Sequence, residues 1–201
     1  IWNIVLSFCE WKGSGSPTFI GIQNYVQSFT TQAARQSIEH SIFIGIVSAL
    51  VSIVLGIGFA LALFRIQGKL SSVARVIFYS PTMIPMTVLG LLFTFIFGAS
   101  DNGLLNAILA AMGLESLQHA WLSERGTVLW VIAIIQGWRS SGTIMILSYT
   151  AMLNIPDSLF ESAELEGCGY WKKSRYIILP LIKQTVRLAL SMTLVWAFKT
   201  Y

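Results

Sequence analysis

Two long uncharged runs limit the folds that are open to this chain of 201 residues. Residues 41–64 and residues 76–100 contain no Asp, Glu, Lys or Arg. The first run has 24 residues, and a helix of that length is about 36 Å long, enough to cross the ~30 Å hydrocarbon core of a bilayer with some tilt. Charged residues make up 11% of the chain, whereas a soluble domain carries about 25%. The sequence therefore predicts an integral membrane protein built from helices.

The remaining apolar stretches extend this pattern to an all-α, multi-span helical bundle. Residues 126–154 and 176–201 are each long enough to span, and residues 1–11 are interpreted as the outer end of a further span. Five spans are therefore expected here, and at least six in the full protein. Residues 104–112 predict one short amphipathic helix outside the membrane. Because the chain begins without a methionine and ends inside an apolar stretch, we expect residues 1–201 to form a single transmembrane domain truncated at both ends.

The lysines and arginines predict the orientation of the chain in the membrane. Three fall within residues 65–75, and three within residues 172–175. Residues 101–125 contain one and residues 12–40 contain two. By the positive-inside rule the first two segments are cytoplasmic. The formal net charge of +4 is spread over the ends of apolar runs, so it does not indicate nucleic-acid binding.

Prolines and small residues mark two of the expected spans. Pro81 and Pro85 lie in the first turns of the run 76–100. Each removes a backbone donor, so the sequence leaves open either a kinked helix or a helix that begins only after Pro81. In the run 41–64, small residues recur at the spacing that lets another helix approach closely. They are Gly56, Gly58, Ala60 and Ala62.

A polar stripe interrupts the run 126–154. Its members follow the i, i+3, i+4, i+7 spacing of one helix face, and they are Gln136, Arg139, Ser140 and Thr143. A charge well inside a bilayer costs at least ~2.5 kcal/mol on insertion scales, so Arg139 needs a cavity or a partner. The stripe favours the lining of a polar solute pathway. For Arg139 alone, a structural polar contact with a neighbouring helix, or snorkelling to the surface, stays an equal alternative.

The longest charged stretch, residues 155–182, begins with acids and continues with bases. Residues that often begin or end helices divide this stretch, namely Pro156, Gly167 and Pro180. Their positions predict two short helices joined at a glycine hinge. The first helix is expected to start near Ser158, with Glu161 at capping-box spacing in its first turn. Gly167 is expected to end it in the left-handed conformation.

This stretch carries a spaced motif, E-x-A-x-x-x-G, nine residues, then I-x-L-P. It resembles the cytoplasmic coupling loop, or EAA loop, of ABC importer membrane subunits, here residues 155–180, although Ser162 replaces the usual first alanine. The resemblance implies contact with an ATPase subunit, and the alternative for Glu161 is that it only caps its own helix. The residues expected to dock the ATPase are Glu161, Ser162, Ala163, Gly167, Leu179 and Pro180.

A second motif lies before the first uncharged run. Phe19, Gly21, Asn24 and Tyr25 resemble the F-x-G-x-x-N-Y signature of carbohydrate-type, maltose-type permeases of the same family. The alternative is an amphipathic segment at the membrane surface. In the maltose-type relatives, sugar contacts lie on the span before the coupling loop, and by distance from Glu161 they fall on the polar stripe.

The resemblance implies an ABC importer made of several subunits. This chain would be the permease domain of an ATP-driven importer of a sugar or oligosaccharide, in the cytoplasmic (inner) membrane of a bacterium or archaeon. Its partners would be a second homologous permease, two cytoplasmic ATPase subunits and an extracytoplasmic solute-binding protein. ATP and Mg would be bound by the ATPases, and no cofactor is expected in this chain. A permease for a non-sugar solute, such as a glycerol phosphate, is the alternative.

Other classes of membrane protein lack support in the residues. An intramembrane enzyme needs a nucleophile or metal cluster inside the bilayer, but His40 and His119 both fall in segments expected outside. A secondary transporter would show acids in its spans and no coupling loop. Cys9 and Cys168 are expected in different compartments and lack metal-ligand spacing. No catalytic or metal-binding residue is therefore assigned.

Overall fold

The computed structural model describes residues 2–66, 68–98 and 103–200, with the backbone alone for residues 196–200. The chain is mostly helical, as predicted, and its contacts divide it into two compact units, Ile1–Ile42 and Phe43–Thr200. A single permease domain stays a prediction. The helix α3, Gln32–Arg65, begins in the first unit, and its residues from Phe43 onward belong to the second.

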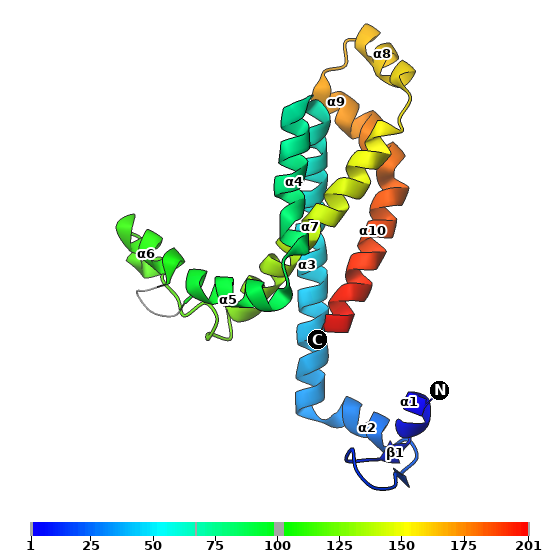
Figure 1. Cartoon of the computed structure of the whole chain (residues 1–201), viewed down its shortest axis with the longest axis vertical. Coiled ribbons are helices and arrows are strands. Elements are labelled where there is room, and N and C mark those ends of the chain that lie inside the picture. Colours follow the sequence, from blue (N-terminus) through cyan, green and yellow to red (C-terminus); the bar gives the residue numbers. More distant parts are fainter. Residues whose placement is uncertain (1, 67, 99–102, 201) are drawn as a thin grey trace. The chain divides into compact units, whose positions relative to one another are not determined.

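The first unit contains a small sheet that the all-α prediction missed. Its other elements are α1, Trp2–Leu6, and α2, Gln23–Thr30. Strand β1, Cys9–Glu10, pairs antiparallel with β2, Thr18–Phe19, so that Cys9 lies opposite Phe19 (Figure 1). Residues 2–10 therefore form a short helix and a strand, and the expectation that residues 1–11 are the outer end of a span stays a prediction.

The F-x-G-x-x-N-Y residues hold this unit together. The Asn24 side-chain amide donates 3.0 Å hydrogen bonds to the carbonyl oxygens of Ser7 and Cys9. The Tyr25 hydroxyl lies 2.7 Å from the Ser7 hydroxyl, and its ring packs against Phe8. Gly21 has a φ of 64°, a conformation that other residues rarely adopt. The motif thus ties α2 to the strand pair.

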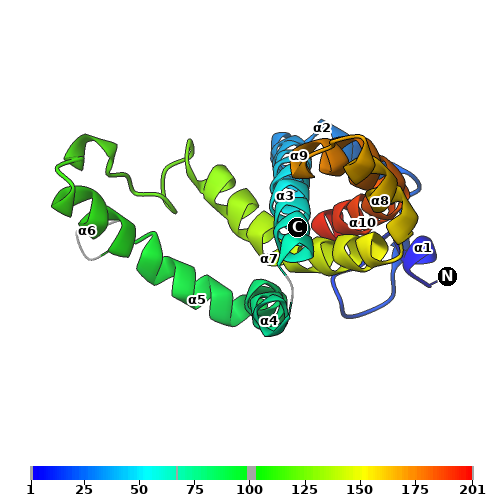
Figure 2. The same ribbon diagram turned by 90° about the horizontal axis from the view of Figure 1, so that it is seen from above.

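The second unit is built around α7, Val128–Leu153. This helix packs against α4, Lys69–Met83, and α10, Leu179–Thr200, and touches α3 at Gly56 (Figure 1). Figure 2 shows α5, Met86–Ile96, leading away from the end of α4 towards α6. The remaining elements are α6, Leu104–Ala111; η1, Glu115–Leu117; α8, Asp157–Leu165; α9, Tyr170–Lys173; and the π-helical η2, Ser174–Ile178.

Close approach of α3 and α7 confirms part of the small-residue prediction. A β-carbon on Gly56 would lie 2.7 Å from the Ile144 β-carbon, and one on Gly137 would lie 2.6 Å from the Val51 β-carbon. Gly56 and Ala60 are buried in this contact region, whereas Gly58 and Ala62 are exposed. Only the Gly56–Ala60 face therefore serves helix packing.

The kink expected at the prolines is confirmed, whereas a helix that begins only after Pro81 is not found. The helix α4 begins at Lys69 and contains Pro81 in its last turn, so the loop after α3 is far shorter than residues 65–75. The break comes at Ile84, whose backbone is extended with ψ of 127°, and Pro85 then caps α5. A residue before proline is pushed out of the helical region, which accounts for the 98° bend between α4 and α5.

Two described helices are long and apolar enough to cross a membrane, Gln32–Arg65 and Tyr170–Val195. The bent pair α4–α5 makes a third if it counts as one span. The helix α7 has sufficient length, but the polar stripe lowers its hydropathy. The five predicted spans are therefore not all confirmed, whereas the helical membrane character is.

Candidate functional site

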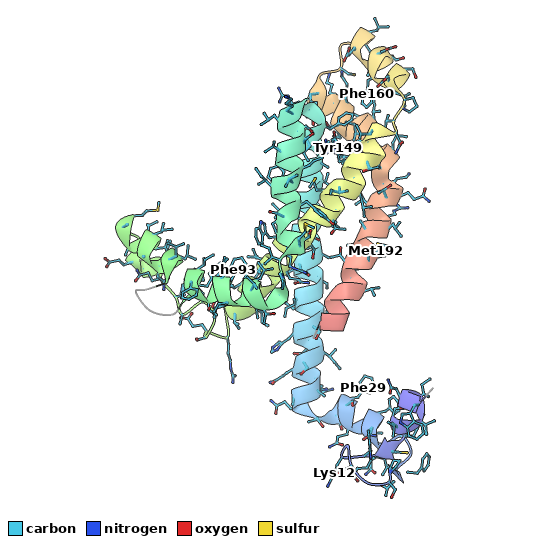
Figure 3. All side chains as sticks on the ribbon, viewed as in Figure 1. Lys12, Phe29, Phe93, Tyr149, Phe160 and Met192 are labelled. Carbon is cyan, nitrogen blue, oxygen red and sulfur yellow. The ribbon has the colours of Figure 1, made fainter. Side chains whose placement is uncertain are left out.

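The polar stripe of α7 lines a cavity of about 320 Å³. All four predicted pathway residues face it, namely Gln136, Arg139, Ser140 and Thr143. The other walls come from α4 and α10, and Met192 of α10 is labelled in Figure 3. The other lining residues are Thr82, Leu147, Ala189, Met192 and Thr193. The sequence reasoning missed these five. Leu147 lies on the same face of α7 as the stripe, four residues after Thr143, whereas no motif or periodicity links the other four to it.

Two polar groups of the stripe have no partner within the described part of the chain. Gln136 is 6% exposed, and its Oε1 accepts no hydrogen bond. The Nε of Arg139 is likewise buried without an acceptor. An unpaired buried polar group is unfavourable by about 1–3 kcal/mol, so a polar solute that paired with these groups would be favoured here.

The buried residues of α7 outside the stripe are mostly apolar. They include Ala133, Ile144 and Met145, with Ser141 and Ser148 among them. Trp138 packs edge-on against Phe93 of α5, at 5.9 Å between ring centroids, and does not line the cavity (Figure 3). The helix therefore has one face for its neighbours and one for the cavity.

The helix α8 begins at Asp157, close to the predicted start at Ser158, but the predicted cap does not form. Pro156 occupies the N-cap and makes no side-chain cap, so the Ser158–Glu161 capping box does not form. Asp157 is the acid of the first turn, and Glu161 lies one turn later, exposed. Pro156 has no side-chain oxygen that could accept a backbone N–H, so its side chain cannot cap the helix. Capping therefore does not account for Glu161.

The C-terminus of α8 is as predicted. Gly167 has a φ of 73°, and nothing lies within 4 Å of the β-carbon position. Its N–H donates to the Glu164 carbonyl at 2.9 Å, and the Cys168 N–H donates to the Ala163 carbonyl at 2.8 Å. This pair of bonds is the Schellman motif, and glycine adopts its left-handed turn at no steric penalty.

One face of α8 packs against the rest of the second unit. Ala163 is buried, and the Phe160 ring lies 5.7 Å from the Phe64 ring of α3 (Figure 3). Glu161, Ser162 and Gly167 are exposed. Three of the predicted docking residues thus lie on the accessible side of α8, and Ala163 lies beneath them.

Leu179 and Pro180 lie outside α8, at the start of α10. The second helix does not end at Pro180, because α9, η2 and α10 run on without a break. In η2 the Leu179 N–H reaches back five residues to the Ser174 carbonyl. A π-helical turn rearranges the hydrogen bonds just where Pro180 lacks a donor. Leu179 is partly buried against the apolar core cluster, and the docking role of Leu179 and Pro180 stays a prediction.

Comparison with known proteins gives related sequences along the whole chain. Residues 52–201 match the family described as "Binding-protein-dependent transport system inner membrane component". The chain is 34% identical over 201 residues to the probable ABC transporter permease protein YurN of Bacillus subtilis, covering 99% of this chain and 68% of that protein. It is 27% identical over 201 residues to the probable starch degradation products transport system permease protein AmyD of Thermoanaerobacterium thermosulfurigenes, covering 67% of that protein.

A solved structure shares the fold. It is a bacterial ABC transporter involved in the import of the acidic polysaccharide alginate, matched with a TM-score of 0.82 at 21% identity. The match covers 98% of this chain and 66% of that one. The chain thus spans about two thirds of the length of these relatives.

Proposed function

Since the chain belongs to the family of binding-protein-dependent transport system inner membrane components, we propose that it forms the membrane-spanning permease subunit of an ATP-driven sugar or oligosaccharide importer. The observation that carries the proposal is the cavity, because four polar residues from one face of α7 line it together with Thr82 and Thr193 of the neighbouring helices. The sugar class is supported by relatives named for glucose import, starch degradation products and arabinooligosaccharides.

The remaining parts of the machine follow from the family. The importer would lie in the cytoplasmic (inner) membrane of a bacterium or archaeon. A second permease would complete the pathway, and an extracytoplasmic binding protein would deliver the solute to it. Two ATPase subunits would hold ATP and Mg and hydrolyse the nucleotide, so that this chain translocates without catalysing a reaction. Glu161, Ser162 and Gly167, exposed on and just after α8, would meet the ATPase on the cytoplasmic side.

The connection of α8 to its neighbours suggests how the two sites communicate. The chain enters α8 directly from α7 and leaves it through α9 and η2 into α10. Both α7 and α10 line the cavity. A displacement of α8 by the ATPase would therefore move α7 and α10, two walls of the cavity, together. The loop 155–180 would then make different contacts in the two states of the transporter.

Ser140→Trp tests the pathway. Filling the cavity with an indole ring should abolish uptake into proteoliposomes while the ATPase subunits still co-purify. Ser80→Trp is the matched control, because Ser80 is exposed on α4 and does not line the cavity. Normal uptake by a fully assembled Ser140→Trp complex would contradict the proposal.

A further inference from the structure

We infer that the cavity selects solutes that carry an anionic group, a carboxylate or a phosphate, beside hydroxyl groups. The inference rests on the proposed function, since it names the class of solute for the same cavity. Three features of the lining support it: an uncompensated charge, unengaged hydroxyl groups, and the absence of acids from the helices around them.

Arg139 is the single charged residue among those lining the cavity. The ion pairs found in the described chain are His119–Glu124 and Lys173–Glu164, and neither involves it. Arg75 of α4 differs, because it donates to the Ser71 carbonyl and the Ser72 hydroxyl and lies over the Tyr149 ring. Arginine keeps its charge in proteins, so the charge of Arg139 is directed at whatever occupies the cavity.

Ser140 and Thr143 hold their hydroxyl groups free for a second kind of contact. Several serines and threonines on α4, α7 and α10 donate to their own backbone, as Ser141 does to the Trp138 carbonyl and Thr193 to the Ala189 carbonyl. Ser140 and Thr143 make no such bond in the described structure, and Gln136 leaves its Oε1 unpaired. A guanidinium suits a carboxylate or phosphate, while hydroxyl and amide groups suit solute hydroxyls.

The helices packed around Arg139 contain no Asp or Glu. None occurs in α4, α7, α10 or the part of α3 in the second unit. The nearest acids along the chain, Glu124 and Asp157, lie beyond the two ends of α7 and do not line the cavity. The countercharge for Arg139 therefore has to come from outside this part of the chain, and the cavity in front of it is the place where a solute would supply it.

The experiment measures solute binding to the assembled transporter, with both permeases and the ATPases, in nanodiscs. The probes are radiolabelled digalacturonate, its neutral counterpart α-1,4-galactobiose, and glucose 6-phosphate. Wild-type complex should bind one of the two anions at least tenfold more tightly than galactobiose, and which one it prefers distinguishes carboxylate from phosphate. Arg139→Gln should remove this preference, and Arg139→Lys should retain part of it.

Arg187→Gln is the matched control, because Arg187 is exposed on α10 and does not line the cavity. It should keep the full preference for the anion. Equal wild-type affinity for all three probes, binding of none of them, or an anion preference that persists in Arg139→Gln would each overturn the inference. So would loss of the second permease from Arg139→Gln, since Arg139 would then pair with that subunit. If Ser140→Trp still blocks uptake in any of these cases, the proposed permease function is retained, and only the inferred anionic class of solute is rejected.

Discussion

The Tyr170 hydroxyl donates a 2.6 Å hydrogen bond to the carbonyl oxygen of Leu61, 109 residues earlier in the chain. The bond joins α9, which lies within residues 155–180, to the end of α3. Arg65 of α3 lies over the same ring, at 5.5 Å from its centroid. The segment that would receive the force of the ATPase is therefore anchored at its exit as well as at Phe160.

Tyr170→Phe should weaken this anchor while keeping the ring in place. Loss of the hydrogen bond is expected to lower stability by about 1 kcal/mol and to reduce solute-stimulated ATP hydrolysis. Thermal unfolding of the purified complex and its ATPase rate check the two effects. Tyr176→Phe, at a tyrosine that is 72% exposed, is the control and should change neither. If the two variants have the same thermal stability and the same ATPase rate, the Tyr170–Leu61 hydrogen bond does not contribute to coupling.

Gly167→Val should uncouple the permease from its ATPase. A side chain in the left-handed conformation costs roughly 1–2 kcal/mol, so α8 would end differently and redirect the chain into α9. We expect normal membrane levels with loss of ATPase co-purification. Gly169→Val is the matched control, because Gly169 has a φ of −71° and an open β-carbon position. A Gly167→Val complex that keeps its ATPase and transport would remove the coupling role from this turn.

Glu161→Lys should also impair ATPase docking. Glu161 is exposed and makes no described ion pair, so reversing its charge affects a partner more than the fold. Co-purification of the ATPase should fall at least tenfold, while the melting temperature of the permease stays unchanged. Glu166→Lys repeats the charge reversal at the exposed C-cap of the same helix. If both variants lose the ATPase equally, general charge and not a specific contact governs docking.

Gly56→Leu should destabilise the packing of α3 on α7. Its β-carbon would meet Ile144 at 2.7 Å and the Ser141 carbonyl oxygen at 2.8 Å, and the backbone atom has little room to move. Overpacking of this kind typically costs about 1–3 kcal/mol. Gly58→Leu, where nothing lies within 4 Å, serves as control. Size-exclusion profiles after heating should show early loss of the first variant alone.

Cysteine labelling checks the orientation. In a background with Cys9 and Cys168 replaced by serine, Lys69→Cys should be protected from an impermeant external reagent, because the positive-inside rule places the start of α4 in the cytoplasm. Ser116→Cys, in the segment before α7, should react. Both positions are exposed in the structure, so accessibility within the fold is matched. Reversed labelling would contradict the cytoplasmic placement of α8.

Much of the candidate site could be read from residues close together in the chain. The spacing of Gln136, Arg139, Ser140 and Thr143 places them on one face of any α-helix, because 3.6 residues make a turn. Gly167 was predictable for the same reason, since a helix end in the left-handed conformation excludes most side chains. Both inferences depend only on backbone geometry within a few turns.

Contacts between distant segments determined the rest. Thr82, Met192 and Thr193 join the stripe because α4 and α10 pack beside α7, and no local pattern encodes that neighbourhood. The partial burial of Leu179 and the course of the chain through Pro180 likewise depend on the core formed by α3, α7 and α10. Steric limits and helical periodicity depend only on residues that are close together in the chain. The walls of a cavity come from several helices, and their positions depend on packing between residues many tens of positions apart.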